Sequence, residues 1–120
     1  MEPTAYRLAD LPRRGAADHG DRPALTEGET TWTYADLDAI SNRAAQALAA
    51  DGVGAGDRVA ILDLNGLEFF AVLFGAAKLG AVLAPLNFRL APPEIAQILD
   101  DARPVVLFVG ELFAPVVDAI

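Results

Sequence analysis

Apolar positions follow a helical period in the middle of the chain and gather into short runs beyond it. Spacings of three and four residues predict a helix to about residue 50, with an apolar face made of Leu37, Ile40, Ala44 and Leu48. Three later apolar runs have the length of strands and lie at 58–62, 81–86 and 104–109. Helical segments at 67–79 and 92–101 separate them. Apolar strands that alternate with helices predict a buried, largely parallel β-α-β-α-β sheet with helices on both faces.

The segments before this unit are short and are separated by turn residues. A short amphipathic helix is expected before Gly20, and Pro12 is tolerable only in its first turn. Segments rich in β-formers at 23–26 and 30–34 flank a glycine-containing turn, which predicts a β-hairpin. Thr33 is expected to cap the following helix through its hydroxyl. The expected fold class is therefore α/β, with an N-terminal helix and hairpin ahead of the sheet.

Composition and charge exclude several classes of protein. With 53% hydrophobic and 22% charged residues, the 120-residue chain can bury a core. A formal net charge of −8 disfavours nucleic-acid binding, because a phosphate backbone requires a basic face. The chain has no cysteine and no apolar signal core at its N-terminus, so a cytoplasmic protein is expected. The apolar segment 67–86 contains Glu68, Lys78 and Pro85, which favours a core helix and strand over a transmembrane segment.

Isolated polar residues have structural explanations that require no catalysis. Lys78 ends an apolar helix, where a cation complements the helix dipole. Ser41 lies in mid-helix with no histidine nearby in sequence, which disfavours a role as nucleophile. Asp63 and Asn65 follow the first parallel strand and are expected to cap the helix at Leu67, with a ligand site as the alternative. The single histidine cannot form a metal site by itself.

The most informative segment of the chain is 78–90. A glycine ends the apolar helix, a strand follows at once, and the strand leads directly to Asn87, Phe88 and Arg89. These three residues therefore lie at the carboxyl end of a buried strand, where open α/β sheets bind ligands. They are the candidate site of this chain.

Five phrases, in this order and spacing, resemble the start of the adenylate-forming ligases, the family of acyl-CoA synthetases and related AMP-forming enzymes. They lie at 21–25, 32–37, 56–61, 78–82 with 85–87, and 87–90. The last phrase is typical of acyl-CoA synthetases that act on fatty or aryl acids. Asp36 stands where the family more often has Glu, and Ala91 stands where a Ser or Thr cap is common. The resemblance implies that residues 1–120 are a partial N-terminal subdomain of a larger domain.

The resemblance also implies a two-step reaction and its cofactors. A carboxylate attacks the α-phosphate of ATP to give an acyl-adenylate and pyrophosphate, and a thiol, usually that of coenzyme A, then takes the acyl group. Full-length family enzymes use ATP, Mg²⁺ and coenzyme A on a small carboxylic acid. This chain has one Ser, one Lys and no Ser/Thr/Gly-rich phosphate loop. No catalytic or metal-binding residue is therefore assigned to it, and no cofactor is expected to bind tightly to this chain alone.

Asn87, Phe88 and Arg89 are the only candidate cofactor-binding residues. In some family members the loop after this motif lies near the nucleotide end of coenzyme A. Arg89 could pair with a phosphate there, and Phe88 could stack on adenine. In the alternative interpretation, Asn87 caps backbone groups in a turn, Phe88 packs, and Arg89 pairs with a neighbouring acid.

Two interpretations of function follow. The first is the N-terminal portion of an ATP-dependent acyl-CoA synthetase, a scaffold that is inactive alone and whose partner is the remainder of the ligase domain. The second is a non-catalytic α/β module that binds a nucleotide or coenzyme A, or that self-associates through an exposed sheet edge.

Overall fold

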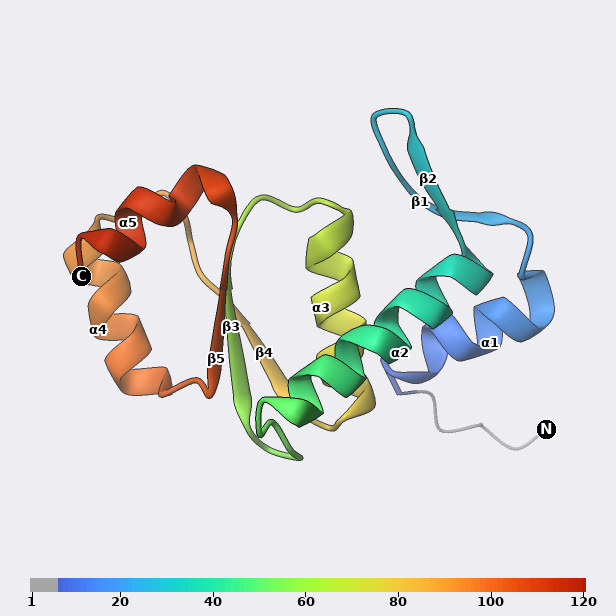
Figure 1. Cartoon of the computed structure of the whole chain (residues 1–120), viewed down its shortest axis with the longest axis horizontal. Helices are drawn as coiled ribbons and strands as arrows, with labels where there is room; N and C mark the ends of the chain where they lie inside the picture. The colour runs from blue at the N-terminus through green and yellow to red at the C-terminus, as the bar shows by residue number, and fades with distance from the viewer. Residues whose placement is uncertain (1–6) are drawn as a thin grey trace.

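A three-stranded parallel sheet lies at the centre of the computed structural model, which describes residues 7–120. The strand order is β4-β3-β5, with α2 and α3 on one face and α4 and α5 on the other (Figure 1). In chain order the elements are α1 (Asp10–His19), β1 (Pro23–Glu27), β2 (Thr30–Thr33), α2 (Tyr34–Ala50), β3 (Arg58–Leu62), α3 (Leu67–Lys78), β4 (Val82–Pro85), α4 (Pro92–Ala102), β5 (Val106–Val109), η1 (Glu111–Phe113) and α5 (Ala114–Asp118). The predicted α/β fold is confirmed.

Strand β3 is the most buried element because both of its neighbours are strands and both of its faces are covered. Val59 and Ile61 pack into the apolar cluster beneath α2 and α3. Ala60 and Leu62 pack into the opposite cluster, around Ile95 of α4. These four strand residues are 0–3% exposed, which explains why the sequence of β3 is continuously apolar instead of alternating.

The start of α2 is fixed by the capping arrangement that the sequence predicts. The hydroxyl oxygen of Thr33 accepts the backbone N–H of Asp36 at 3.1 Å. The carboxylate of Asp36 in turn accepts the backbone N–H of Thr33 at 2.9 Å. Two N–H groups that a helix start leaves without helical partners are thus satisfied by this pair.

Helices α2 and α3 approach each other closely at Gly75. A Cβ atom at that position would lie 2.7 Å from the Cβ of Ala44 and 3.1 Å from the backbone nitrogen of Ala45. Glycine inside a helix costs about 1 kcal/mol relative to alanine. The close packing of the two helices explains why glycine nevertheless occupies this position in the interior of α3.

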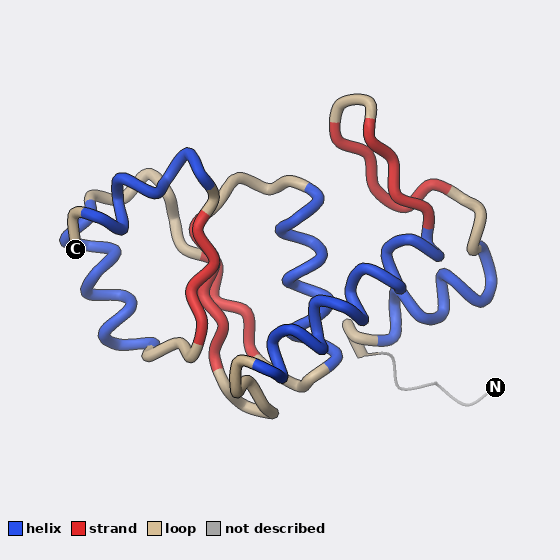
Figure 2. The backbone as a smooth tube through the Cα atoms, viewed as in Figure 1, coloured by secondary structure: helices blue, strands red, loops and turns tan. Residues whose placement is uncertain are grey.

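The N-terminal lobe, residues 7–33, consists of α1 and the β1–β2 hairpin. Helix α1 packs against α2, and Pro12 lies in its first turn as expected. The antiparallel hairpin projects away from the sheet (Figure 2), with Gly28 at its tip at a φ of 59°. A two-stranded ribbon is marginally stable by itself, so its position depends on contacts with α2 and α3.

Two of the predicted strands are shorter than expected. Residues 81 and 86 lie outside β4, and residues 104–105 lie outside β5. The N–H of Ala81 donates to the carbonyl of Ala76 and closes the end of α3, which explains why β4 begins at Val82. The chain after β5 forms the short helices η1 and α5, and Phe113 of η1 joins the cluster around Ile95. Across residues 7–120, no helix is both long and apolar enough to cross a membrane.

Candidate functional site

The loop after β4 is a closed turn that Asn87 organises. The N–H of Leu86 continues the strand ladder by donating to the carbonyl of Ile61 at 2.9 Å. The side-chain oxygen of Asn87 then accepts the N–H of Arg89 at 3.0 Å, and its carbonyl accepts the N–H of Leu90 at 3.1 Å. Asn87 therefore fixes the backbone at the carboxyl end of the sheet, as the structural interpretation of this residue expects.

In this turn the side chain of Arg89 stacks on the ring of Phe88. The ring of Phe88 is half-buried and its centroid lies 5.3 Å from that of Phe113. The guanidinium carbon of Arg89 lies 5.1 Å from the centroid of Phe88 and the side chain is exposed, which is the geometry of a cation–π contact. Within the described part of the chain Arg89 forms no ion pair, so the expected pairing with a neighbouring acid is not seen. Sequence reasoning missed the cation–π contact.

The expected capping of α3 by Asp63 or Asn65 is wrong. The cap residue is Gly66, and it makes no side-chain capping bond. The carboxylate of Asp63 instead accepts the N–H of Leu64 at 2.8 Å, within its own loop. The carboxylate of Glu27 from the hairpin lies so close to Gly66 that a Cβ atom there would overlap with it. A negative side chain from the N-terminal lobe therefore lies at the positive end of α3.

The hollow beside this helix start is acidic. It has a volume of about 260 Å³ and is lined in part by Glu27, Asp63 and Glu68. A Cβ atom at Gly110, just after β5, would overlap with the carboxylate of Asp63, so the ends of β3 and β5 meet here. Within residues 7–120, no group of three or more acidic or histidine side chains is arranged to hold a metal ion.

Lys78 joins α3 to α2. Its ammonium nitrogen lies 2.7 Å from a carboxylate oxygen of Asp38 and 2.6 Å from the side-chain oxygen of Asn42. The side chain is only 13% exposed, so the ion pair is largely shielded from water. Lys78 does lie in the last turn of α3, as expected, but its partners are 40 and 36 positions away and have no local sequence signal.

A second ionic cluster lies at the start of α1. The carboxylate of Asp10, whose side chain is 7% exposed, accepts a guanidinium N–H of Arg13 at 2.9 Å and the backbone N–H of Arg7 at 3.1 Å. These two hydrogen bonds, that from Arg7 first, lower the pKa of Asp10 to about 2. The three-residue spacing of these residues is a helical signal that sequence reasoning did not use.

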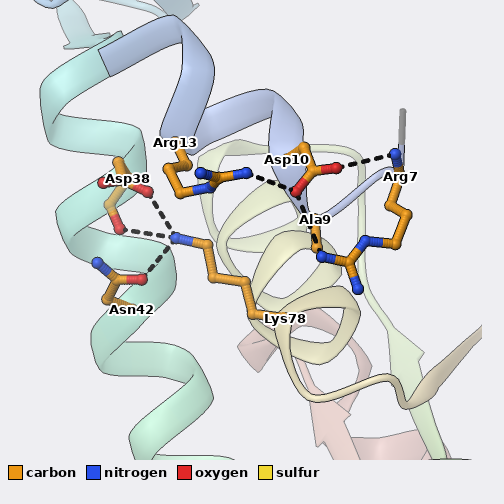
Figure 3. A pocket seen from close by; sticks show the side chains of 7 residues that line it. All are labelled: Arg7, Ala9, Asp10, Arg13, Asp38, Asn42 and Lys78. Carbon is orange, nitrogen blue, oxygen red and sulfur yellow. Dashed lines mark hydrogen bonds and ion pairs between the residues drawn. The ribbon is translucent and has the colours of Figure 1, made fainter. Parts of the chain in front are cut away.

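Both clusters line one pocket of about 220 Å³ between α1, α2 and α3, which we call the α1–α3 pocket (Figure 3). Its residues are Arg7, Ala9, Asp10, Arg13, Asp38, Asn42 and Lys78. The pocket shares no residue with the loop after β4. The sequence analysis proposed a site at the loop after β4 and did not identify the α1–α3 pocket.

Known proteins match most of this chain. The family described as "AMP-binding enzyme" matches residues 12–119. The long-chain-fatty-acid–CoA ligase FadD13 of Mycobacterium tuberculosis is 51% identical over 92 residues, which are 77% of this chain and 18% of that protein. The fatty acid–[acyl-carrier-protein] ligase ScoC of Streptomyces coeruleorubidus is 47% identical over 94 residues, again 18% of its length. The chain therefore spans under a fifth of the length of these two curated relatives.

A solved structure agrees with the sequence matches. The N-terminal domain of FACL13 from Mycobacterium tuberculosis superposes with a TM-score of 0.92 at 41% identity, covering 96% of this chain and 29% of that one. At this identity and coverage the match extends to the whole arrangement of α1, the hairpin and the sheet. The chain belongs to the AMP-binding enzyme family, among adenylate-forming ligases of the acyl-CoA synthetase type.

Proposed function

We propose that residues 1–120 form an N-terminal supporting part of an ATP-dependent acyl-CoA synthetase. The full-length enzyme would convert a carboxylate to an acyl-adenylate and pass the acyl group to coenzyme A, using ATP and Mg²⁺. The observation that carries this proposal is the family match over residues 12–119. The relatives named as fatty-acid ligases and as a 3-hydroxybenzoate–CoA ligase favour a fatty or aryl carboxylic acid as substrate.

The role proposed for this part is that of a scaffold, inactive alone. Its only lysine is held by Asp38 and Asn42, and its only serine, Ser41, is 0% exposed and donates to the carbonyl of Asp38 at 3.0 Å. Three carboxylates line the hollow at the carboxyl edge of the sheet and oppose the approach of a triphosphate. The residues at the carboxyl edge of the sheet therefore do not fit a cradle for the triphosphate of ATP.

A chimera tests this role. The matched segment of the FadD13 ligase is replaced by that of this chain, and fatty-acid-dependent exchange between ATP and pyrophosphate is measured for the chimera and for the isolated chain. We expect exchange by the chimera and none by the isolated chain. A chimera carrying Leu62→Asp, which places a charge in the core, serves as the inactive control. Exchange by the isolated chain, or a folded chimera without exchange, would contradict the proposal.

Within the full enzyme we propose that the turn of Asn87, Phe88 and Arg89 faces the nucleotide end of coenzyme A. Arg89 is exposed and its guanidinium contacts only the Phe88 ring among the described side chains, so it retains hydrogen-bond donors for a phosphate. In the chimera, Arg89→Gln is expected to raise the KM for coenzyme A by about tenfold, because one charge-assisted contact is lost. Exchange between ATP and pyrophosphate, which precedes the thiol step, is expected to stay unchanged. An unchanged KM for coenzyme A in Arg89→Gln would contradict the proposal that this turn contacts coenzyme A.

A second candidate function is self-association, favoured by the exposed edges of the sheet. Val82 on the edge strand β4 is 51% exposed, and Val105 beside β5 is 47% exposed. Open edges and exposed apolar side chains favour pairing with another chain. In the proposed enzyme the remainder of the ligase domain is the partner that covers these edges. Size-exclusion chromatography of the isolated chain distinguishes self-association from a role that needs only the remainder of the ligase domain. A monomer at high concentration would count against self-association.

A further inference from the structure

The α1–α3 pocket concentrates positive charge in an acidic protein. Three of the nine cationic residues of the chain line it, against two of the seventeen acids, whereas the chain as a whole carries a net charge of −8. The cations are Arg7, Arg13 and Lys78. The pocket therefore keeps a net positive charge after its two internal carboxylates are counted, which favours an anion over a cation or a neutral ligand.

The two arginines keep hydrogen-bond donors that no group among residues 7–120 is shown to use. Asp10 lies between their guanidinium groups (Figure 3), yet it accepts only one guanidinium N–H, that of Arg13. The guanidinium of Arg7 lies 3.6 Å from Asp10, which is an ion pair and no hydrogen bond. Each guanidinium carries five N–H donors. Both side chains are largely exposed, at 79% for Arg7 and 65% for Arg13, so these donors are accessible.

On the opposite side of the pocket, the position of Lys78 is fixed by hydrogen bonds to α2. Lys78 is committed to Asp38 and Asn42, so it contributes a fixed charge and a fixed position instead of free donors. Arg13 lies in α1, Arg7 lies just before this helix, and Lys78 lies in α3, whereas α2 supplies the groups that anchor the lysine. Two guanidinium forks that are anchored on one buried carboxylate match the geometry in which arginine binds phosphate oxygens.

We propose that the α1–α3 pocket is a binding site for a phosphate dianion, recognised mainly by Arg7 and Arg13. The ligand is inorganic phosphate or the terminal phosphate of a monoester, and the same chemistry is shared by a lipid phosphomonoester headgroup. The site lies away from the loop after β4 and does not depend on the function proposed above.

Isothermal titration of the chain at low ionic strength tests the site with inorganic phosphate and with glycerol 3-phosphate, and chloride serves as the control anion. We expect saturable binding of one phosphate per chain. Arg13→Gln and Arg7→Gln are each expected to weaken binding by about tenfold, since each removes a charge-assisted contact. Arg22→Gln is the matched control, because it removes the same charge from an exposed position outside the pocket and is expected to leave binding unchanged.

The variants also distinguish the sources of the phosphate. Circular dichroism establishes that each variant is folded, and Arg7→Gln, at the more exposed position, provides a second test if Arg13→Gln unfolds. Co-sedimentation with vesicles of phosphatidylcholine containing phosphatidic acid, lost in the same variants, would identify the headgroup as the ligand. Binding of soluble phosphate without vesicle binding would identify a free phosphate or monoester. Absence of saturable binding in both arms, or equal losses in Arg22→Gln, would overturn the proposal.

Discussion

The sheet unit, residues 34–120, and the N-terminal lobe, residues 7–33, are held together by different kinds of contact. The sheet unit has two apolar clusters on the two faces of β3, and its central residues are almost completely buried. The lobe contributes no residue to the buried members of either cluster. Its position depends on the packing of α1 against α2 and on Glu27, beside the start of α3.

The two kinds of contact should differ in the substitutions that they tolerate. Apolar packing is non-directional, so a core can accept other side chains of similar volume. A carboxylate at a helix start, or between two guanidinium groups, works only with its charge and its geometry intact. The apolar core of the sheet unit should therefore respond mainly to changes in volume, and the lobe and the polar contacts between helices mainly to changes in charge.

The largest effect is expected in the core of the sheet unit. Leu62 is 0% exposed, and Leu62→Ala should lower the free energy of unfolding by about 3 kcal/mol, because it removes buried surface and leaves a cavity. Leu64, two residues further along the chain, is 48% exposed. Leu64→Ala should change the free energy of unfolding by less than about 0.5 kcal/mol. Urea denaturation measures both. Similar losses in the two variants would mean that β3 is not the centre of the core.

The next effect is expected at the junction of α2 and α3. Lys78→Met keeps the length of the side chain but leaves Asp38, 24% exposed, without its ionic partner. The free energy of unfolding should fall by about 1–2 kcal/mol. In the background of Asp38→Ala the same substitution should cost clearly less, because the partner is already gone. Additive losses in the double variant would contradict a direct coupling.

A smaller effect is expected where the hairpin meets α2. Thr33→Ala removes the hydroxyl that accepts the N–H of Asp36 and should cost about 1 kcal/mol. Thr30→Ala, at an exposed position at the other end of β2, is the matched control and should cost less. Thermal unfolding followed by circular dichroism compares the two. If the control loses as much stability as Thr33→Ala, the effect belongs to the strand and not to the cap.

The smallest effect, and the one that depends on pH, is expected at Asp10. The pKa of this carboxyl is lowered from 3.8 to about 2 in the folded chain, so the folded state favours the ionised form. Its contribution to stability is therefore fully present above the pKa of the unfolded chain and is lost as the pH falls through the folded value. The stability difference between the natural chain and Asp10→Asn should shrink between about pH 5 and pH 2. A difference that stays constant over this range would contradict the lowered pKa.

The sequence predicted the features that depend on neighbours along the chain. The capping pair of Thr33 and Asp36, three residues apart, could be recognised directly, and so could the apolar run of β3. The partners of Lys78 could not, because a tertiary contact between two helices has no periodic signature. The same holds for Glu27, whose carboxylate lies beside Gly66 at the start of α3: the local rule pointed to Asp63 and Asn65 as caps, and a contact with the hairpin has no signal in the neighbouring sequence.

For the candidate site, the sequence predicted the position of the turn and the role of Asn87, since an Asx-type turn is local. The stacking of Arg89 on Phe88 and the packing of Phe88 against Phe113 depend on where η1 returns to the sheet. That return brings together residues 25 positions apart. The α1–α3 pocket, built from three helices, was missed for the same reason.

The close crossing at Gly75 has a consequence for how proteins of this kind can diverge. Because the hydrogen atom of this residue faces the methyl group of Ala44, the two positions share one small volume. A descendant that acquires a methyl group at position 75 must let the two helices move apart even if the methyl group at position 44 is lost, because the backbone nitrogen of Ala45 would still lie 3.1 Å from the new carbon atom.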